Sequence, residues 1–186
     1  MAPFTGTVNT SPRTRRAAIG SLSLLLLLGL SWSLFTLRGC NKNPVGTGTM
    51  EMKLGGKPYV LEVVDDDAKR ELGMGGRKSI PDGTGMIFVF KTQLSREFVM
   101  RDCPISIDII FLDGAQRVTS MHTMTVEEPR KSTELALQYE KRLKKYSSRF
   151  PAQFAIEIAG GAMQGLNIKP GDKLEFDGEG LKKRAK

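Results

Sequence analysis

The stretch FVMRDCPISIDIIFLDG, residues 98–114, decides the fold, because it contains the strongest predicted strand, Ile105–Leu112. Side chains alternate along a strand, so these residues divide between two faces. One face carries Ile105, Ile107, Ile109 and Phe111, and the other carries Ser106, Asp108, Ile110 and Leu112. Asp113-Gly114 is a hairpin turn signal, and Arg117–Thr123 is the predicted return strand. The stretch therefore predicts a hairpin built on the central strand of the domain.

Shorter strands and helices are predicted on both sides of this hairpin. Asp65, Asp66 and Asp67 begin a short helix that ends near Leu72, since carboxylates cap free N–H groups at a helix N-terminus. Residues 132–146 predict an amphipathic surface helix. The other predicted strands are Met50–Leu54, Pro58–Val64, Gly85–Phe90, Phe98–Met100, Ala152–Ile158 and Lys173–Phe176. This pattern indicates a β-rich α+β fold, a single small domain with a bent sheet or barrel-like core and short helices.

The N-terminal residues predict export or membrane attachment. Three arginines precede an uncharged run, Ala17–Leu37, which as a helix would span roughly 30 Å, about one bilayer core. The positive flank is expected to stay cytoplasmic, so that the rest of the chain faces the periplasm or the cell exterior. Leu37-Arg38-Gly39-Cys40 resembles a bacterial lipobox, in which Cys40 would be acylated. Three interpretations stay open: a lipoprotein signal, an uncleaved anchor and a cleaved secretory signal.

The charge is distributed unevenly over four predicted segments. These are a signal or anchor (1–40), a linker (41–49), the β-rich domain (50–177) and a basic tail (178–186). The formal net charge is +8, but residues 1–40 hold four arginines and no acids, residues 181–186 carry +4, and residues 41–180 are balanced. A nucleic-acid-binding domain usually concentrates basic charge on one face of its fold. We therefore expect no nucleic acid partner, and a tail that aids solubility or touches anionic lipid headgroups.

Three blocks of sequence carry a family resemblance. They are residues 77–90, residues 98–114, and Glu157–Gly160 followed by Gly171-Asp172. Their order and spacing resemble the bacterial and archaeal family called domain of unknown function 192, from about residue 61 to residue 176. The middle block of that family usually reads Phe-Trp-Met-Lys-Asn-Thr. The family's helix that corresponds to residues 132–146 is usually shorter. The replaced positions are Val99, Arg101, Asp102 and Cys103. The family has no established activity, so the resemblance implies a fold and an exported domain rather than a reaction.

Four polar residues within the apolar blocks are candidate ligand-binding residues: Arg77, Arg101, Asp102 and Asp108. A carboxylate between Ile107 and Ile109 is costly to bury unpaired, so Asp108 is expected to pair with Arg77 or Arg101. Such a pair would be either a structural ion pair or part of an Arg/Asp cluster that lines a pocket. A pocket of that kind would bind a small polar or anionic ligand.

Cys103 and His122 are the only candidate nucleophile and base. A small packed side chain is the alternative for Cys103, which could also form a disulfide with Cys40 if Cys40 is not acylated. With one histidine and no Cys-x-x-Cys motif, the sequence predicts no structural metal site and no cofactor. Met74, Met86 and Met100 are expected in the core, and Met100, Cys103 and Met121 form a weak candidate set for copper(I).

These patterns favour a membrane-tethered, extracytoplasmic protein of the bacterial envelope. Its expected role is that of a non-catalytic accessory or small-ligand-binding module. The alternatives are a small thiol-dependent enzyme that uses Cys103 and His122, and a purely structural envelope protein.

Overall fold

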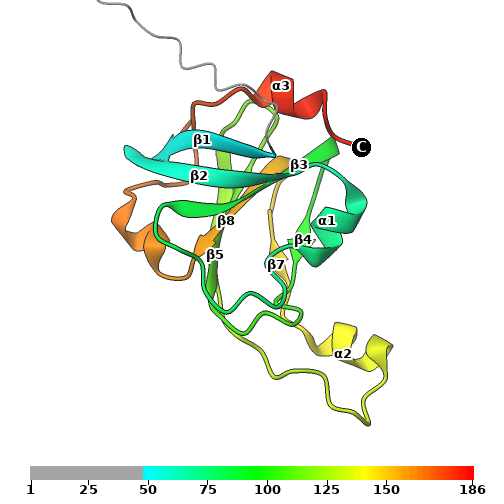
Figure 1. Cartoon of the computed structure of the whole chain (residues 1–186). Coiled ribbons are helices and arrows are strands. Elements are labelled where there is room, and N and C mark those ends of the chain that lie inside the picture. The colour runs from blue at the N-terminus through cyan, green and yellow to red at the C-terminus, as the bar shows by residue number, and fades with distance from the viewer. Residues whose placement is uncertain (1–47) are drawn as a thin grey trace, which may run out of the picture. The chain divides into compact units, whose positions relative to one another are not determined.

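A computed structural model describes residues 48–186 of the protein (Figure 1). The predicted membrane segment and Cys40 lie outside the described residues. The strands are β1 (Thr49–Leu54), β2 (Lys57–Val64), β3 (Thr84–Leu94), β4 (Glu97–Phe98), β5 (Ile107–Leu112), β6 (Val118–Met124), β7 (Tyr146–Ser147) and β8 (Ala152–Ala159). The helices are α1 (Asp67–Leu72), α2 (Ala136–Arg142) and α3 (Gly178–Lys182), with a 3-10 helix η1 (Ala162–Gly165). None of the helices within residues 48–186 has the length and apolar character needed to cross a membrane.

Six strands form one mixed sheet in the order β1-β2-β3-β8-β5-β6, and β4 and β7 form a separate two-stranded ladder. β2 and β3 are parallel, and the other neighbouring strands are antiparallel. α1 makes the crossover between the parallel strands, as Figure 1 shows. This architecture confirms the β-rich α+β class.

The central strands are buried on both faces, so two apolar clusters form. The predicted alternation of β5 is confirmed, because Ile107, Ile109 and Phe111 enter one cluster and Ile110 and Leu112 enter the other. The cluster that contains Ile107, Ile109 and Phe111 also holds Met74, Met86, Phe88 and Met100. We call it the cavity-side core, because a cavity described below lies beside it. The second cluster joins residues of β1, β2 and β8 with Leu174 and Leu181.

Local sequence signals place the ends of several elements correctly. The glycine pair at 55–56 joins β1 to β2 with both residues at positive φ, and a Cβ on Gly55 would lie 1.7 Å from the carbonyl oxygen of Leu166. Asp66 caps α1 by accepting a hydrogen bond from the backbone N–H of Lys69 at 2.9 Å. These contacts agree with the predicted strands Met50–Leu54 and Pro58–Val64 on either side of the glycine pair, and with the predicted acidic start of the helix.

Three predicted elements are shorter than expected. The helix within 132–146 covers Ala136–Arg142 only, and Leu135 rather than Ser132 precedes its first residue. Phe98–Met100 contributes only Phe98 to a strand, and Lys173 forms one isolated bridge with Arg117. Short polar stretches carry weak periodicity, so their ends depend on the surrounding packing rather than on local sequence.

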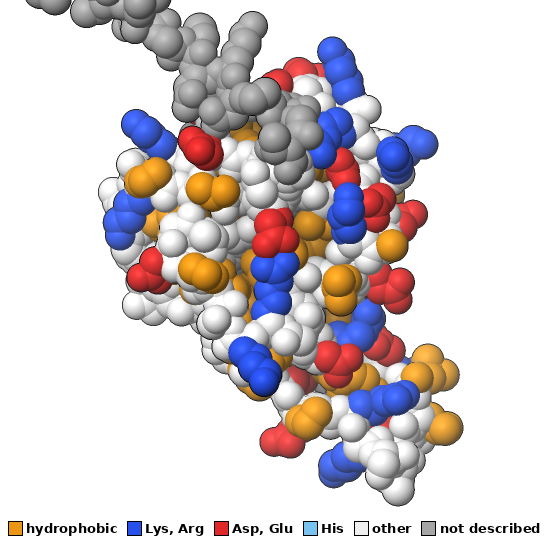
Figure 2. Space-filling view, viewed as in Figure 1, with side chains coloured by type: hydrophobic (Ala, Val, Ile, Leu, Met, Phe, Trp, Pro, Cys, Tyr) orange, Lys and Arg blue, Asp and Glu red, His pale blue; other side chains and the backbone are white. Residues whose placement is uncertain are grey.

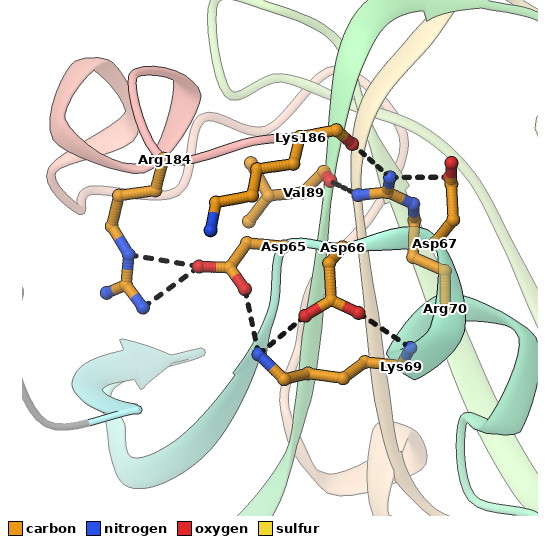
Figure 3. A network of polar contacts seen from close by, with 8 residues as sticks. All are labelled: Asp65, Asp66, Asp67, Lys69, Arg70, Val89, Arg184 and Lys186. Carbon is orange, nitrogen blue, oxygen red and sulfur yellow. Dashed lines mark hydrogen bonds and ion pairs between the residues drawn. The ribbon is translucent and has the colours of Figure 1, made fainter.

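Residues 178–186, which we predicted as a basic tail, are part of the fold. Leu181 of α3 is fully buried in the second cluster. Figure 3 shows Arg184 beside the Asp65 carboxylate, 3.0 Å from it, and Arg70 donating to Lys186 O. The backbone N–H of Lys186 also donates to Asp65 O at 2.8 Å. Arg184 thus meets an acid beside α1, Lys186 is held through its backbone, and Leu181 supplies the apolar contact.

Candidate functional site

A cavity of about 460 Å³ lies over one face of the sheet, beside α1 and β4. Its lining comes from four places that are remote in sequence: α1 and the turn after it, β3, the segment from residue 95 to residue 103, and β8. The lining residues are Arg70, Glu71, Leu72, Gly73, Met74, Phe88, Phe90, Ser95, Arg96, Glu97, Phe98, Val99, Arg101, Cys103 and Glu157. The size suits a small organic molecule.

Glu157 is the buried acid of this cavity. It lies on β8 between Met86 of β3 and Ile109 of β5, and its side chain is 5% exposed. Its Oε2 atom is buried without a hydrogen-bond partner among the described residues. Burial raises the pKa of Glu157 from 4.5 to about 8, and the charge of Arg77 opposes that rise only in part. The carboxyl is therefore mostly neutral at pH 7 and can donate a hydrogen bond.

Arg96 is the cavity arginine that lacks an acidic partner within residues 48–186. Arg70 pairs with Asp67 at 2.7 Å, and Arg101 pairs with Glu140 through two contacts of 2.5 and 2.8 Å. The Arg96 guanidinium instead donates to the Thr92 carbonyl and stacks on the Phe90 ring, with Cζ 4.1 Å from the ring centroid. Its Nε is buried without a partner. Burial and the nearby charge of Arg70 lower the pKa of Arg96. The site therefore contains a positive charge that the protein does not neutralise.

Aromatic side chains form one wall of the cavity. Phe98 packs edge-to-face against Phe88, Phe90 and Phe111, with ring centroids 5.1, 6.3 and 5.3 Å apart. Phe90 lies within β3 and Arg96 lies in the bend after it, so the Arg96 side chain reaches back over the Phe90 ring that this packing holds in place. The cavity thus combines an apolar wall with two unsatisfied polar atoms.

The predicted pairing of Asp108 with an arginine is wrong. Asp108 is fully buried, but it points to the second cluster, where its Oδ2 accepts a hydrogen bond from the backbone N–H of Met163 at 2.8 Å. Arg77 pairs with Glu62 at 2.7 Å. Neither Asp108 nor Arg77 lines the cavity, so among the four predicted ligand-binding residues only Arg101 does. The partner of Asp108 Oδ2 is a backbone N–H, which a sequence pattern does not reveal, and Asp108 Oδ1 is buried without a partner among residues 48–186.

Asp102 does not face the cavity either, but it helps to hold the segment that does. Its backbone adopts a positive φ of 52°, which is uncommon outside glycine. The Tyr139 hydroxyl of α2 lies 3.2 Å from the Asp102 backbone N and 3.4 Å from its Oδ1. With the Arg101–Glu140 pair, this places α2 against two of the four family positions that are replaced here.

The structure does not bring Cys103 and His122 together. The Cys103 thiol donates to the Arg101 carbonyl at 3.4 Å, and His122 Nε2 lies 2.7 Å from the Ser147 carbonyl. Burial, aided by Glu157 and Asp102, raises the pKa of Cys103 to about 11. Cys103 and His122 each contact a different backbone carbonyl rather than each other, so the predicted nucleophile–base pair is not formed.

The weak copper set is also divided by the sheet. Met100 and Cys103 belong to the cavity-side core, whereas Met121 packs against the second cluster. Within residues 48–186, no group of three or more His, Cys, Asp and Glu side chains is placed to hold a metal ion. Met74, Met86 and Met100 are buried in the core, as expected.

A larger groove of about 800 Å³ runs between β1 and residues 167–177. The buried residues that line it are apolar, including Met52, Leu174 and Leu181. Its charged side chains, such as Glu51 and Glu175, are exposed to solvent. The smaller cavity is the candidate site because it alone of the two contains a buried titratable group.

Sequence reasoning missed Glu157 and Arg96. Glu157 lies in an otherwise apolar strand, between Ile156 and Ile158, just as Asp108 lies between two isoleucines. The argument that a carboxylate there must find a partner therefore applied equally to Glu157 and would have singled it out. Arg96 lies in a polar bend with no such signal.

The mixed six-stranded sheet with a cavity over one face defines a small β-rich α+β domain. The chain belongs to the DUF192 family, described as "Uncharacterized ACR", whose family model matches residues 50–176. This match confirms the resemblance inferred from the sequence blocks.

Two solved structures are similar to this chain. A protein of unknown function from Novosphingobium aromaticivorans matches with a TM-score of 0.54 and 25% identity, over 72% of this chain and 89% of that one. A Sinorhizobium meliloti protein, described as a candidate transcription regulator, matches with a TM-score of 0.52 and 22% identity, over 70% and 92%. The second likeness concerns the fold alone. No curated protein matches this chain significantly.

Proposed function

We propose that this domain is a non-catalytic module that binds a small ligand in the cavity beside α1 and β4. The observation that carries the proposal is the buried carboxyl of Glu157, whose Oε2 has no partner among residues 48–186 and whose side chain lines the cavity. An unsatisfied buried polar atom lowers stability, and a ligand would satisfy it. The uncompensated charge of Arg96 supports the same conclusion.

A thiol-dependent enzyme has less support. A nucleophilic cysteine needs a low pKa or an adjacent base, whereas Cys103 has a pKa raised to about 11 and lies near Glu157 and Asp102. His122 makes its hydrogen bond to the Ser147 carbonyl instead. We therefore assign Cys103 a packing role in the wall of the cavity.

We propose further that the domain is tethered at the outer face of a bacterial membrane by residues 1–40. The support is the arginine-flanked apolar run and the lipobox-like sequence that ends at Cys40. Mass spectrometry of the full chain from its native host tests this proposal. A diacylglycerol mass on an N-terminal Cys40 supports the lipoprotein, and an intact N-terminus supports an uncleaved anchor. A soluble secreted form that begins after the apolar run would overturn the tether.

Native mass spectrometry of the same preparation tests the binding proposal. We expect the wild-type protein to retain a small molecule, and Val99→Trp to lose it, because Val99 lines the cavity and indole would fill it. Val60→Trp is the matched control, since Val60 is 43% exposed and lies away from the cavity. Retention by Val99→Trp at the wild-type level would show that the molecule binds elsewhere. No retained molecule in any of the three proteins would favour a structural envelope role.

A further inference from the structure

The charges around the cavity identify the chemistry of its ligand. The arginines on its rim are Arg70, Arg96 and Arg101, and the carboxylates on its rim are Glu71 and Glu97, both exposed. Ion pairs already occupy Arg70, Arg101 and Glu97, the last through Lys145 at 2.8 Å. Arg96 is left as the cation next to the aromatic wall. The remaining rim carboxylate, Glu71, is exposed and its charge acts on Arg101, so the place where an anionic group is missing is Arg96 itself.

Arg96 is fixed in place for such a contact. Its backbone N–H donates to the Ser148 hydroxyl at 2.9 Å, and its carbonyl accepts from the Ser148 N–H at 2.9 Å. Ser148 is fully buried, so the bend that carries Arg96 is tied to the core. Arg70 approaches the same Phe90 ring, with Cζ 5.9 Å from its centroid, so the two guanidinium groups repel each other there. An anion at Arg96 would relieve that repulsion.

The other residues that line the cavity determine which kind of anion fits beside Arg96. Phe90 and Phe98 present apolar surface directly beside Arg96, which favours an anion with an apolar body over a fully hydrated inorganic ion. The buried Glu157 adds a polar group with one unsatisfied oxygen. A neutral carboxyl at that place does not repel an anion, and it can donate to a second oxygen of the ligand.

We propose that the cavity binds a small organic monocarboxylate, with its carboxylate on Arg96 and its apolar body against Phe90 and Phe98. This inference rests on the proposed binding function and names its ligand class. The carboxylate geometry matches the planar guanidinium, which favours paired hydrogen bonds.

Isothermal titration of the full-length protein in detergent, freed of any retained ligand, tests the ligand class with three probes of one shape. These are phenylacetate, the neutral phenylacetamide and the cationic phenethylamine. We expect phenylacetate to bind roughly 10- to 100-fold more tightly than either of the others, which is the range for a charge-assisted hydrogen bond. Inorganic phosphate is the fourth probe, and we expect it to bind at least about 10-fold more weakly than phenylacetate, because it lacks the apolar body.

The variant Arg96→Gln should reduce phenylacetate affinity by roughly 10- to 100-fold. Arg149→Gln is the control, because Arg149 is exposed and lies outside the cavity. Its affinity should equal that of the wild type. Circular dichroism and the unfolding midpoint of both variants show whether each is folded. A folded Arg96→Gln protein with wild-type affinity would overturn the proposal, as would tighter binding of phenethylamine or phosphate.

Failure of this inference is distinguishable from failure of the binding function. If none of the probes binds, but the wild type retains a host molecule that Val99→Trp loses, the cavity is a binding site for another chemical class. If Val99→Trp and the wild type retain the same molecule, the cavity itself is not the site.

Discussion

Glu157 shows how a single buried acid sets the properties of the site. A carboxylate among Met86, Ile109 and Cys103 would be costly without a partner, so the group holds its proton instead. Between pH 4.5 and about pH 8 the unfolded chain loses this proton while the folded chain keeps it. The stabilising effect of the bound proton is therefore complete below pH 4.5 and is lost progressively up to about pH 8.

Glu157→Gln should remove this pH dependence. The amide mimics the neutral acid but does not ionise in the unfolded chain, so the variant should be more stable than the wild type at pH 8, by on the order of 1–4 kcal/mol. The two proteins should have similar stability at pH 4. Urea unfolding at both pH values measures this difference.

Glu128→Gln is the control for that experiment, since Glu128 is exposed and lies outside the cavity. It should not increase stability at pH 8. A Glu157→Gln protein that is less stable than the wild type at pH 8 would mean that Glu157 is ionised and paired in the folded protein.

Cys103 is predicted to be unreactive in the folded protein. With a pKa of about 11, on the order of one thiol in a few thousand is ionised at pH 7.4, and the side chain is 9% exposed. Iodoacetamide should therefore label Cys103 rapidly only after unfolding in guanidinium chloride, as peptide mass spectrometry would measure. Complete labelling of the native protein within minutes would restore the thiol-enzyme hypothesis.

At the scale of elements, α2 supports the segment that lines the cavity. It lies in the excursion between β6 and β7, which projects from the sheet in Figure 1. Figure 2 shows hydrophobic, basic and acidic side chains mixed on this excursion, and Leu135 and Leu137 are 68% and 65% exposed. Tyr139 and Glu140 on its inner side contact Asp102 and Arg101. The two segments in which the sequence was expected to depart from the family pattern, residues 132–146 and the changed block, thus meet in space.

Tyr139→Phe should loosen this segment. Loss of the hydroxyl removes a partner of the strained Asp102 backbone and should lower stability by about 1 kcal/mol. Amide hydrogen exchange should become faster at residues 99–103. Tyr146→Phe is matched to it, because the Tyr146 hydroxyl also bonds to a backbone N–H, that of Thr125 at 3.1 Å. Equal exchange at 99–103 in both variants would show that α2 does not hold the cavity segment.

At the scale of the whole molecule, the last residues complete the fold. α3 fills the second cluster through Leu181. The segment after it joins Asp65, just before the crossover helix α1, and Arg70 within that helix (Figure 3). Arg70 also lines the cavity, where its guanidinium donates to the Val89 carbonyl at 2.8 Å. The C-terminal segment therefore stabilises the α1 wall of the candidate site.

Leu181→Ala should destabilise the domain by about 2–5 kcal/mol, since it leaves a cavity in a fully packed cluster. Lys183→Ala, in the same segment but exposed, should change stability by less than about 0.5 kcal/mol. Chemical denaturation of the full chain compares them. Equal, small effects would mean that residues 178–186 are a solvated tail after all.

The sequence by itself determined the class of fold and several element ends. Period-two alternation in β5, the glycine pair before β2 and the acidic cap of α1 are local signals, and local geometry enforces them whatever surrounds them. The family resemblance was likewise recognised from short blocks of sequence. The prediction of a basic tail was wrong because it rested on the four basic residues of this segment. Its single leucine, Leu181, is buried and decides how the segment packs.

Only the tertiary structure decided the site. Asp108 and Glu157 look alike in sequence, each a carboxyl between isoleucines. Asp108 Oδ2 receives the backbone N–H of Met163 beside the second cluster, whereas Glu157 lines the cavity and its Oε2 has no partner among residues 48–186. Likewise, the sequence contains many arginines, and only the packing of the β3–β4 bend on Phe90 leaves Arg96 without an acid. Which groups meet depends on contacts between remote segments, and the cost of burying an unpaired charge is set by those contacts rather than by its neighbours in the chain.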